Sequence, residues 1–289
     1  MSTTPVTSPR KAAAARDRAL RGLDRLPPLS PVVGRLLSRL AFNDVGFKEL
    51  TALVVKDAIL CAQILKTINS AAFARSRTIS SIQQAMTLLG ISQLRRIAVG
   101  FAVGNLFSKA KTPRSWSRER FNLHSGATAL LTEAIVEEIA PEDKDGAFVG
   151  GMLHDLGKLL IAVTLPEDYE TIAATVLATG APPFECERET LGIDHAELSA
   201  LALRKWGLHE LVWLAVHRHH DPRAMDAPWL AVVIERADRF VNHLGITVLP
   251  PTVQDGEPPS IEIPSCEFDT SAVLQRFETE WIELANFFR

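Results

Sequence analysis

The stretch GGMLHDLGKLL at 150–160 places three ionisable side chains, His154, Asp155 and Lys158, in an otherwise apolar segment. Burying an imidazole, a carboxylate and an ammonium group costs free energy unless they are paired or bound to something. A metal ion, a substrate phosphate or a local hydrogen-bond network could each satisfy them. The residue types alone leave these three explanations open.

Histidines are concentrated in the same part of the chain, since all eight lie between positions 124 and 243. Eight residues scattered at random would fall within so narrow a window on the order of one time in a hundred. A single histidine near an apolar face is more often a hydrogen-bonded core residue than a metal ligand. We interpret His209, His217 and His243 in that way, but the concentration as a whole indicates a site.

A shared metal site is the chemistry that this residue set could support. Two divalent ions that share a hydroxide need neutral imidazoles and carboxylates from several helices, with at least one bridging carboxylate. Two adjacent pairs and three single residues among apolar helical positions offer such a set: His154–Asp155, His219–His220, His124, His195 and Asp238. Adjacent residues on a helix diverge by about 100°, yet both members of a pair can reach a binuclear centre into which their helix points. Asp155 would then be the bridging ligand.

Helices must position these residues, and apolar residues recur at three- and four-residue steps through most of the chain. Alternation typical of strands is hard to find. We therefore predict an all-α fold built of two helical lobes. From the second lobe onward the predicted helices span 121–139, 144–162, 194–205, 208–219, 226–243 and 269–288, the last with Asp269 or Thr270 as its N-cap.

Proline-rich and polar stretches divide the chain into parts. LPPLSP at 26–31 and FSKAKTPRSWS at 107–117 are two boundaries, and the five prolines of 244–266 indicate a long surface loop. The predicted parts are a basic, loosely attached N-terminal extension at 1–25, a first lobe at 26–108, a second lobe at 117–243, and a loop with a closing helix that packs on the domain at 244–289.

Composition excludes several classes of protein. A net charge of −3 provides no global basic field for nucleic acid, and we interpret the basic run at 10–25 as a solvated helical face. Direct nucleic-acid binding therefore ranks last among the functions considered. The three cysteines are isolated, which argues for a reducing cytoplasm without a thiolate zinc site. Apolar stretches are too short to cross a bilayer, so we expect a cytoplasmic protein with no membrane partner.

The order of the candidate ligands resembles the HD superfamily of metal-dependent phosphohydrolases, whose H…HD…D pattern lies on a helical bundle. His124, His154, Asp155 and Asp238 match that pattern. The additional His195 and His219–His220 resemble the extended ligand set of the HD-GYP cyclic-di-GMP phosphodiesterases, in which HDxGK also occurs. The chain departs from them after His220, where DPRAMDAPWL holds no GYP motif.

A closer resemblance, over most of 26–243, is to the HDOD domain, a bacterial signalling relative of HD-GYP. It is carried by LPPLSPVVGRLL, VVKDAILCAQILKTINSAAF and TISSIQQAMTLLGISQLRRIAVG in the first lobe, and by FNLHSGATALL, GGMLHDLGKLL, ERETLGIDHAELSALALRKWGL and VHRHHDP in the second. The resemblance implies a signalling or regulatory module, many of whose relatives have an eroded site. This chain departs from that expectation because it keeps all seven candidate ligands.

Two functions follow as hypotheses. The first is a regulatory module with an unknown signalling protein partner, a metal-binding HD-like site, and an interaction surface on the first lobe around Asp57, Asn69, Ser70 and Gln93. The second is a metal-dependent phosphohydrolase acting on a nucleotide or phosphodiester. In it, one or two ions, iron or manganese, would activate water, and Lys158 would neutralise charge on the phosphoryl oxygens. Asp155 and Lys158 would then be catalytic, and a nucleotide or phosphate would be the ligand.

Overall fold

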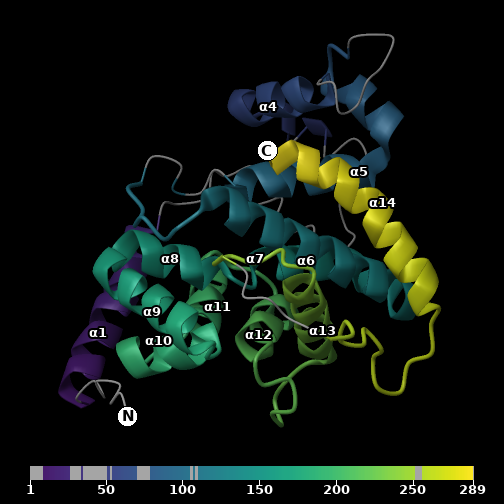
Figure 1. Ribbon diagram of the computed structural model, residues 1–289. Coiled ribbons are helices and arrows are strands. Elements are labelled where there is room, and N and C mark those ends of the chain that lie inside the picture. Colours follow the sequence, from purple (N-terminus) through teal and green to yellow (C-terminus); the bar gives the residue numbers. More distant parts are fainter. Residues whose placement is uncertain are drawn as a thin grey trace.

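The computed structural model describes residues 9–26, 34, 51–52, 54–69, 79–104, 107, 110–250 and 256–288. Its regular elements in these ranges are all helices, so the all-α prediction is confirmed (Figure 1). Residues 27–31 of the predicted proline-rich boundary and Ser70 lie outside the described residues.

The first lobe contains α4 (Ala58–Ile68) and α5 (Ile82–Gly104). Asp57 accepts a hydrogen bond from the Leu60 amide at 3.0 Å and thereby caps α4. Asn69 pairs with both the amide and the carbonyl of Ile79, each at 2.8 Å, and so ties the end of α4 to the start of α5. Asp57 and Asn69 thus form hydrogen bonds at the two ends of α4. Helix α5 bends at Gly90, whose φ of 79° favours glycine.

The second lobe consists of the helices from α6 to α13 (Figure 1). They are α6 (Arg118–Ile139), α7 (Lys144–Leu153), α8 (Leu156–Thr164), α9 (Pro166–Thr179), α10 (Pro183–Leu191), α11 (His195–Lys205), α12 (Glu210–Arg218) and α13 (Trp229–His243). Helix α6 packs against α7 and α13, and every residue from His124 to Val136 is buried. The core therefore runs along α6. The predicted helices of this lobe are found, except the one at 144–162, with two more, α9 and α10, between them.

The predicted continuous helix at 144–162 is wrong, because the chain breaks into α7 and α8 at His154–Asp155. Asp155 has φ −98° and ψ 9°, outside helical values. The buried Ser199 hydroxyl satisfies the peptide groups at the break, since it donates to the His154 carbonyl at 2.9 Å and accepts from the Gly157 amide at 2.7 Å. A serine of α11 therefore offsets the hydrogen bonds that the helix loses.

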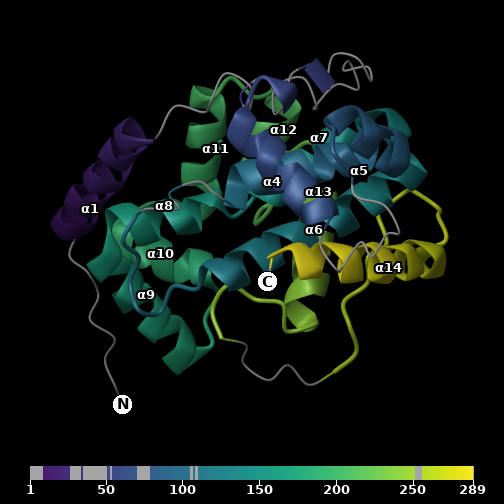
Figure 2. The same ribbon diagram turned by 90° about the horizontal axis from the view of Figure 1, so that it is seen from above.

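The N-terminal extension is not loosely attached, in contrast to the prediction. Helix α1 (Pro9–Gly22) packs against α8 and α10 and continues into the short helix η1 (Leu23–Arg25) (Figures 1 and 2). Arg16 donates to the Gly192 carbonyl at 2.6 Å and to Glu197 at 2.5 Å. A basic residue of α1 therefore contacts the turn that leads into α11 directly.

The closing helix α14 (Thr270–Phe288) lies along α6 in both views (Figures 1 and 2). Asp269 is its N-cap and accepts from the amides of residues 271 and 272 at 3.0 Å each. Glu280 of α14 pairs with Arg96 of α5 at 2.9 Å, and Arg96 also pairs with Glu133 of α6 at 2.7 Å. One buried arginine therefore joins both lobes and the C-terminal helix.

One segment among the described residues, Gly146–Thr164, is long and apolar enough to cross a membrane. It is 89% buried inside the protein. A segment buried to this extent belongs to the protein core. The break at His154–Asp155 divides this segment into two helices.

Candidate metal centre

The seven residues predicted as metal ligands come together in one place, although they are spread from position 124 to 238. They come from α6, the break between α7 and α8, the start of α11, the turn after α12, and α13. The side chains of His124, His154, Asp155, His195 and His219 are fully buried or nearly so, and Asp238 is 9% exposed. Five segments of the chain thus contribute ionisable groups to a single interior site.

The first half of the cluster contains His124, His154, Asp155 and Asp238. The His124 Nε2 atom lies 3.2 Å from Asp155 Oδ2 and 3.1 Å from Asp238 Oδ1. The His154 Nε2 atom lies 3.5 Å from both Asp155 Oδ1 and Asp238 Oδ1. Two imidazoles and two carboxylates therefore surround one point.

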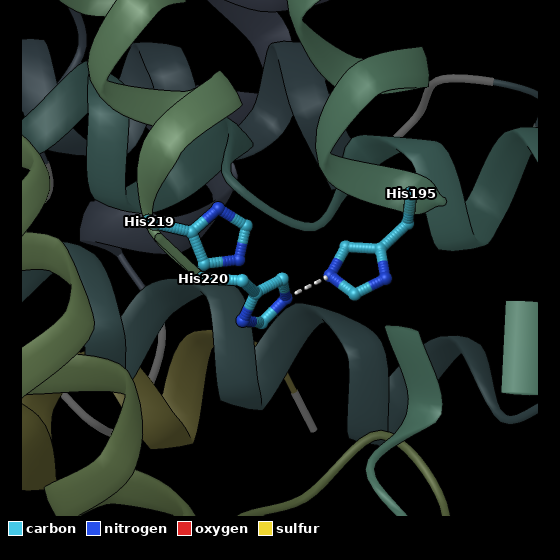
Figure 3. Close-up of side chains that lie close together, drawn as sticks. All are labelled: His195, His219 and His220. Atoms are coloured by element: carbon cyan, nitrogen blue, oxygen red, sulfur yellow. Dashed lines mark hydrogen bonds between the residues drawn. The ribbon is translucent and has the colours of Figure 1, made fainter. Parts of the chain in front are cut away.

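The second half contains His195, His219 and His220, whose rings face one another (Figure 3). The Nε2 atoms of His195 and His220 are 2.8 Å apart. Their ligand atoms and that of His219 lie within 4.8 Å of one another, as do those of His124, His154 and Asp155. Asp155 connects the halves, because its Oδ1 atom is also 3.1 Å from His195 Nε2.

The outward-facing ring nitrogens fix the orientation of four of these histidines. The Nδ1 atoms of His124, His154 and His219 lie 2.8, 2.7 and 2.6 Å from the carbonyls of residues 246, 151 and 216. A carbonyl only accepts, so each Nδ1 carries a proton and each ring directs its Nε2 atom at the cluster. His195 is held similarly, with Nδ1 2.6 Å from Glu187. Such second contacts are typical of metal-bound histidines.

Several inward-facing atoms have no hydrogen-bond partner, although they are buried. They are the Nε2 atoms of His124, His154 and His219 and the Oδ1 atom of Asp155. Buried polar atoms rarely lack a partner, because desolvation without compensation costs about 1–3 kcal/mol for each group. A divalent cation satisfies such lone pairs, so the residues present fit a metal ion.

Electrostatics in the cluster favour added positive charge. Burial alone would lower the pKa of His124, but the Asp155 and Asp238 carboxylates raise it to about 9. Burial also opposes ionisation of Asp155, yet its positive neighbours hold the pKa of this carboxyl well below its usual range. Burial lowers the pKa of His219 to about 3, so this imidazole is neutral. Ionised carboxylates beside the neutral His219 ring belong to the donor types that divalent metals prefer.

Lys158 lies beside the cluster and is not a surface residue. Its Nζ atom donates to Asp155 Oδ2 at 2.6 Å, and its side chain is 14% exposed. Burial would lower the pKa of this amine, but Asp155 raises it. The lysine therefore remains charged and holds the carboxylate that connects the two halves.

Four residues at the site were not identified from the sequence. Glu187 holds the His195 ring, and Phe184 stacks on His220 with ring centroids 4.4 Å apart. Ser199 joins α8 to α11 through the bonds at the break. Gly157 lets α8 touch α11, because a Cβ atom there would meet the His195 carbonyl oxygen at 2.1 Å. The glycine of HDLGK was a visible signal, whereas the other three had none in their spacing.

A cavity of about 720 Å³ opens onto the cluster. Lys158, His195, His219, His220 and Asp238 are among the residues that line it. Helices α9, α10 and α13 and the segment that follows α13 form the remaining walls. The site therefore has room for a ligand beside a bound ion.

Comparisons with known proteins show related folds. A crystal structure of an HDOD domain protein of unknown function from Geobacter sulfurreducens has a TM-score of 0.78, 22% identity, and 96% coverage of each chain. A candidate phosphohydrolase from Shewanella amazonensis has a TM-score of 0.70, with 21% identity and coverage of 94% of this chain and 98% of that one. At such identities these likenesses show the fold.

Two further relatives are longer than this chain. A candidate signal transduction protein from Marinobacter aquaeolei has a TM-score of 0.72 and 19% identity, and the alignment covers 99% of this chain and 66% of that one. An uncharacterised protein from Treponema pallidum is 23% identical over 256 residues, which is 88% of this chain. The chain spans 46% of the length of that curated relative.

The sequence model of the HDOD domain matches residues 26–222. This match covers more than half of the chain and includes six of the seven clustered residues, and Asp238 follows it. The chain belongs to the HDOD domain family.

Proposed function

We propose that the chain is a regulatory signalling module whose second lobe holds one or two divalent metal ions, iron or manganese, between His124, His154, Asp155, His195, His219, His220 and Asp238. The observation that carries this proposal is the set of buried, unpartnered atoms that face one another in the cluster. The mixture of imidazole nitrogens and carboxylate oxygens suits these metals. Asp155 would hold an ion in each half of the cluster, since its two oxygens face different histidines.

The regulatory role is supported by a direct connection between the site and the first lobe. Helix α6 carries His124 and, further along, Glu133. Glu133 is buried and pairs with Arg96 of the first lobe at 2.7 Å. A shift of α6 on ligand binding would therefore strain a buried ion pair, which is costly to disturb. In this function a nucleotide or phosphate ligand acts at the second lobe and a signalling protein responds to it.

A second candidate function is hydrolysis of a phosphoester, favoured by the cavity that opens onto the cluster. A bound metal ion lowers the pKa of a water molecule and so supplies a nucleophile at neutral pH. Asp155 would hold the ions, and Lys158 would hold Asp155 and neutralise charge on a phosphoryl oxygen. The outward bonds of the histidines would keep the ligand set rigid during the reaction.

Elemental analysis of the purified full chain tests the metal centre. We expect the wild-type protein to contain at least one divalent ion, His124→Ala and His220→Ala each to lose part of the metal, and Asp155→Ala to lose most of it. His209→Ala is the matched control, because His209 is exposed at the start of α12. A wild-type chain without metal, together with unchanged stability of Asp155→Ala, would refute the centre.

Turnover assays then separate the two functions. The metal-loaded chain is assayed with cyclic dinucleotides and generic phosphodiesters in the presence of manganese. Full metal content without hydrolysis supports the regulatory module. Hydrolysis that Asp155→Ala and Lys158→Met both abolish supports the phosphohydrolase.

A further inference from the structure

The cavity beside the cluster is lined by candidate metal ligands and by a group of apolar side chains. His195, His219 and His220 are the histidines of the cluster that line it. The wall formed by α9 consists of Ile172, Ala173, Val176 and Leu177 together with the ring of Tyr169. A ligand of this cavity therefore meets both candidate metal ligands and the apolar side chains of α9.

The apolar surface continues beyond α9. The turn between α9 and α10 adds Pro182 and Pro183, and the segment after α13 adds Val248, Leu249 and Pro250. Leu177 is 44% exposed, although it is a large apolar side chain in a helix. Exposed apolar surface that lines a concave site indicates a ligand that covers it.

The charges of the described lining residues limit the ligand further. Two of these residues are always positive, and each is already paired: Lys158 with Asp155 at 2.6 Å, and Arg239 with Glu235 at 3.1 Å. The carboxylates in the lining are Glu187, Glu235, Asp238 and Glu257. Binding sites for several phosphates depend on multiple arginine or lysine contacts. The lining therefore offers little unpaired positive charge to a ligand with more than one phosphate group.

We propose that the cavity binds a phosphoester with a single phosphate group and an apolar organic body. This inference rests on the proposed function, because the phosphate binds at the metal centre while the body covers the α9 wall. A nucleotide differs in its polar sugar, and an inorganic anion leaves the apolar wall uncovered. The ligand is thus a phosphate ester of an apolar alcohol, and the α9 wall determines which alcohols bind.

Calorimetric titration of the manganese-loaded full chain tests the inference. The probes are methylphosphonate and hexylphosphonate, whose carbon–phosphorus bond resists hydrolysis, and adenosine monophosphate. A buried methylene group contributes about fourfold in affinity. We expect hexylphosphonate to bind at least about tenfold more tightly than methylphosphonate, and more tightly than adenosine monophosphate.

Variants distinguish the α9 wall from the metal centre. Leu177→Asp is expected to remove most of the preference for the hexyl group and to leave methylphosphonate affinity unchanged. Leu88→Asp is the matched control, since Leu88 is an exposed leucine on α5, 51% exposed and outside the cavity. Because both positions are exposed, neither variant disturbs the core.

The outcomes separate this inference from the proposed function. Equal affinity of the metal-loaded chain for the two phosphonates, or a preference for adenosine monophosphate, would overturn the apolar ligand alone. A chain that binds no metal under any loading condition would overturn both proposals. Retention of the hexyl preference in Leu177→Asp would overturn the assignment of the α9 wall.

Discussion

Replacement of Gly157 by alanine tests the contact that holds α8 against α11. A Cβ atom at this position would lie 2.1 Å from the His195 carbonyl oxygen and 2.7 Å from its C and Cα atoms. Ordinary contacts begin at 3.4 Å, so the helices must separate by about 3.4 − 2.1 = 1.3 Å. The obstructing atoms belong to the backbone and cannot rotate away. Overpacking of this kind costs about 1–3 kcal/mol, and we expect the upper end of that range here.

The same change should disturb the metal centre. Separation of α8 from α11 moves Asp155 away from His195. In the wild-type protein the Asp155 Oδ1 and His195 Nε2 atoms lie 3.1 Å apart. It also strains the bond from the Gly157 amide to Ser199. We therefore expect Gly157→Ala to reduce both the free energy of unfolding, measured by urea denaturation of the metal-free protein, and the metal content of the purified chain.

Gly150→Ala is the control for this prediction. The nearest atom to a Cβ there is the Cδ1 atom of Ile234 at 3.2 Å, the end of a flexible side chain. Alanine also has the higher helix propensity, by about 1 kcal/mol. We expect this variant to retain its stability and its metal. If Gly157→Ala were as stable and as metal-rich as Gly150→Ala, the close approach of α8 and α11 would be incorrect.

Three further changes have defined outcomes. Arg16→Ala should lower the thermal midpoint of the chain more than Arg18→Ala does, because Arg16 bonds a main-chain carbonyl as well as a carboxylate, while the more exposed Arg18 bonds one carboxylate. Asp269→Ala should cost about 1 kcal/mol in urea denaturation through loss of the α14 N-cap, with no change in metal content. Burial opposes ionisation of Glu137, but bonds from positive neighbours lower its pKa, so its contribution to stability is present above the unfolded pKa and lost as the pH falls through the folded value. Glu137→Gln should therefore be less stable than wild type at neutral pH and equally stable at a pH below the usual pKa range of glutamate. The same difference in stability at both pH values would contradict this assignment.

The helical fold was predictable because apolar spacing is a local property. Most helices of the second lobe lie close to their predicted positions, and Asp269 caps α14 as expected. The break at His154–Asp155 was not predictable in this way, because the segment is apolar on both sides. The compensating hydroxyl belongs to Ser199, which lies far along the sequence. Non-local hydrogen bonds of this kind leave no periodic trace.

The candidate ligands were predictable for a different reason. Ionisable residues in apolar surroundings conflict with the local pattern, and such conflicts concentrate at functional sites. The residues that orient the ligands do not conflict with it. Glu187 belongs to a helix with other acidic residues, and only the fold shows that it holds His195. Sequence patterns therefore identified the clustered residues but not the residues that orient them.

The position of Lys158 bears on which function the centre performs. Its ammonium group lies 2.6 Å from Asp155, the carboxylate that connects the two halves of the cluster. A lysine held there acts first on the ligand set, and the arginine that lines the cavity, Arg239, is paired with Glu235. Neutralisation of charge on a reacting phosphoryl group would then depend mainly on the metal ions. In this site the fixed positive charges pair with carboxylates of the protein, and apolar side chains line the cavity. Such a site is better suited to binding a phosphoester than to hydrolysing it rapidly. Binding is what a regulatory module requires.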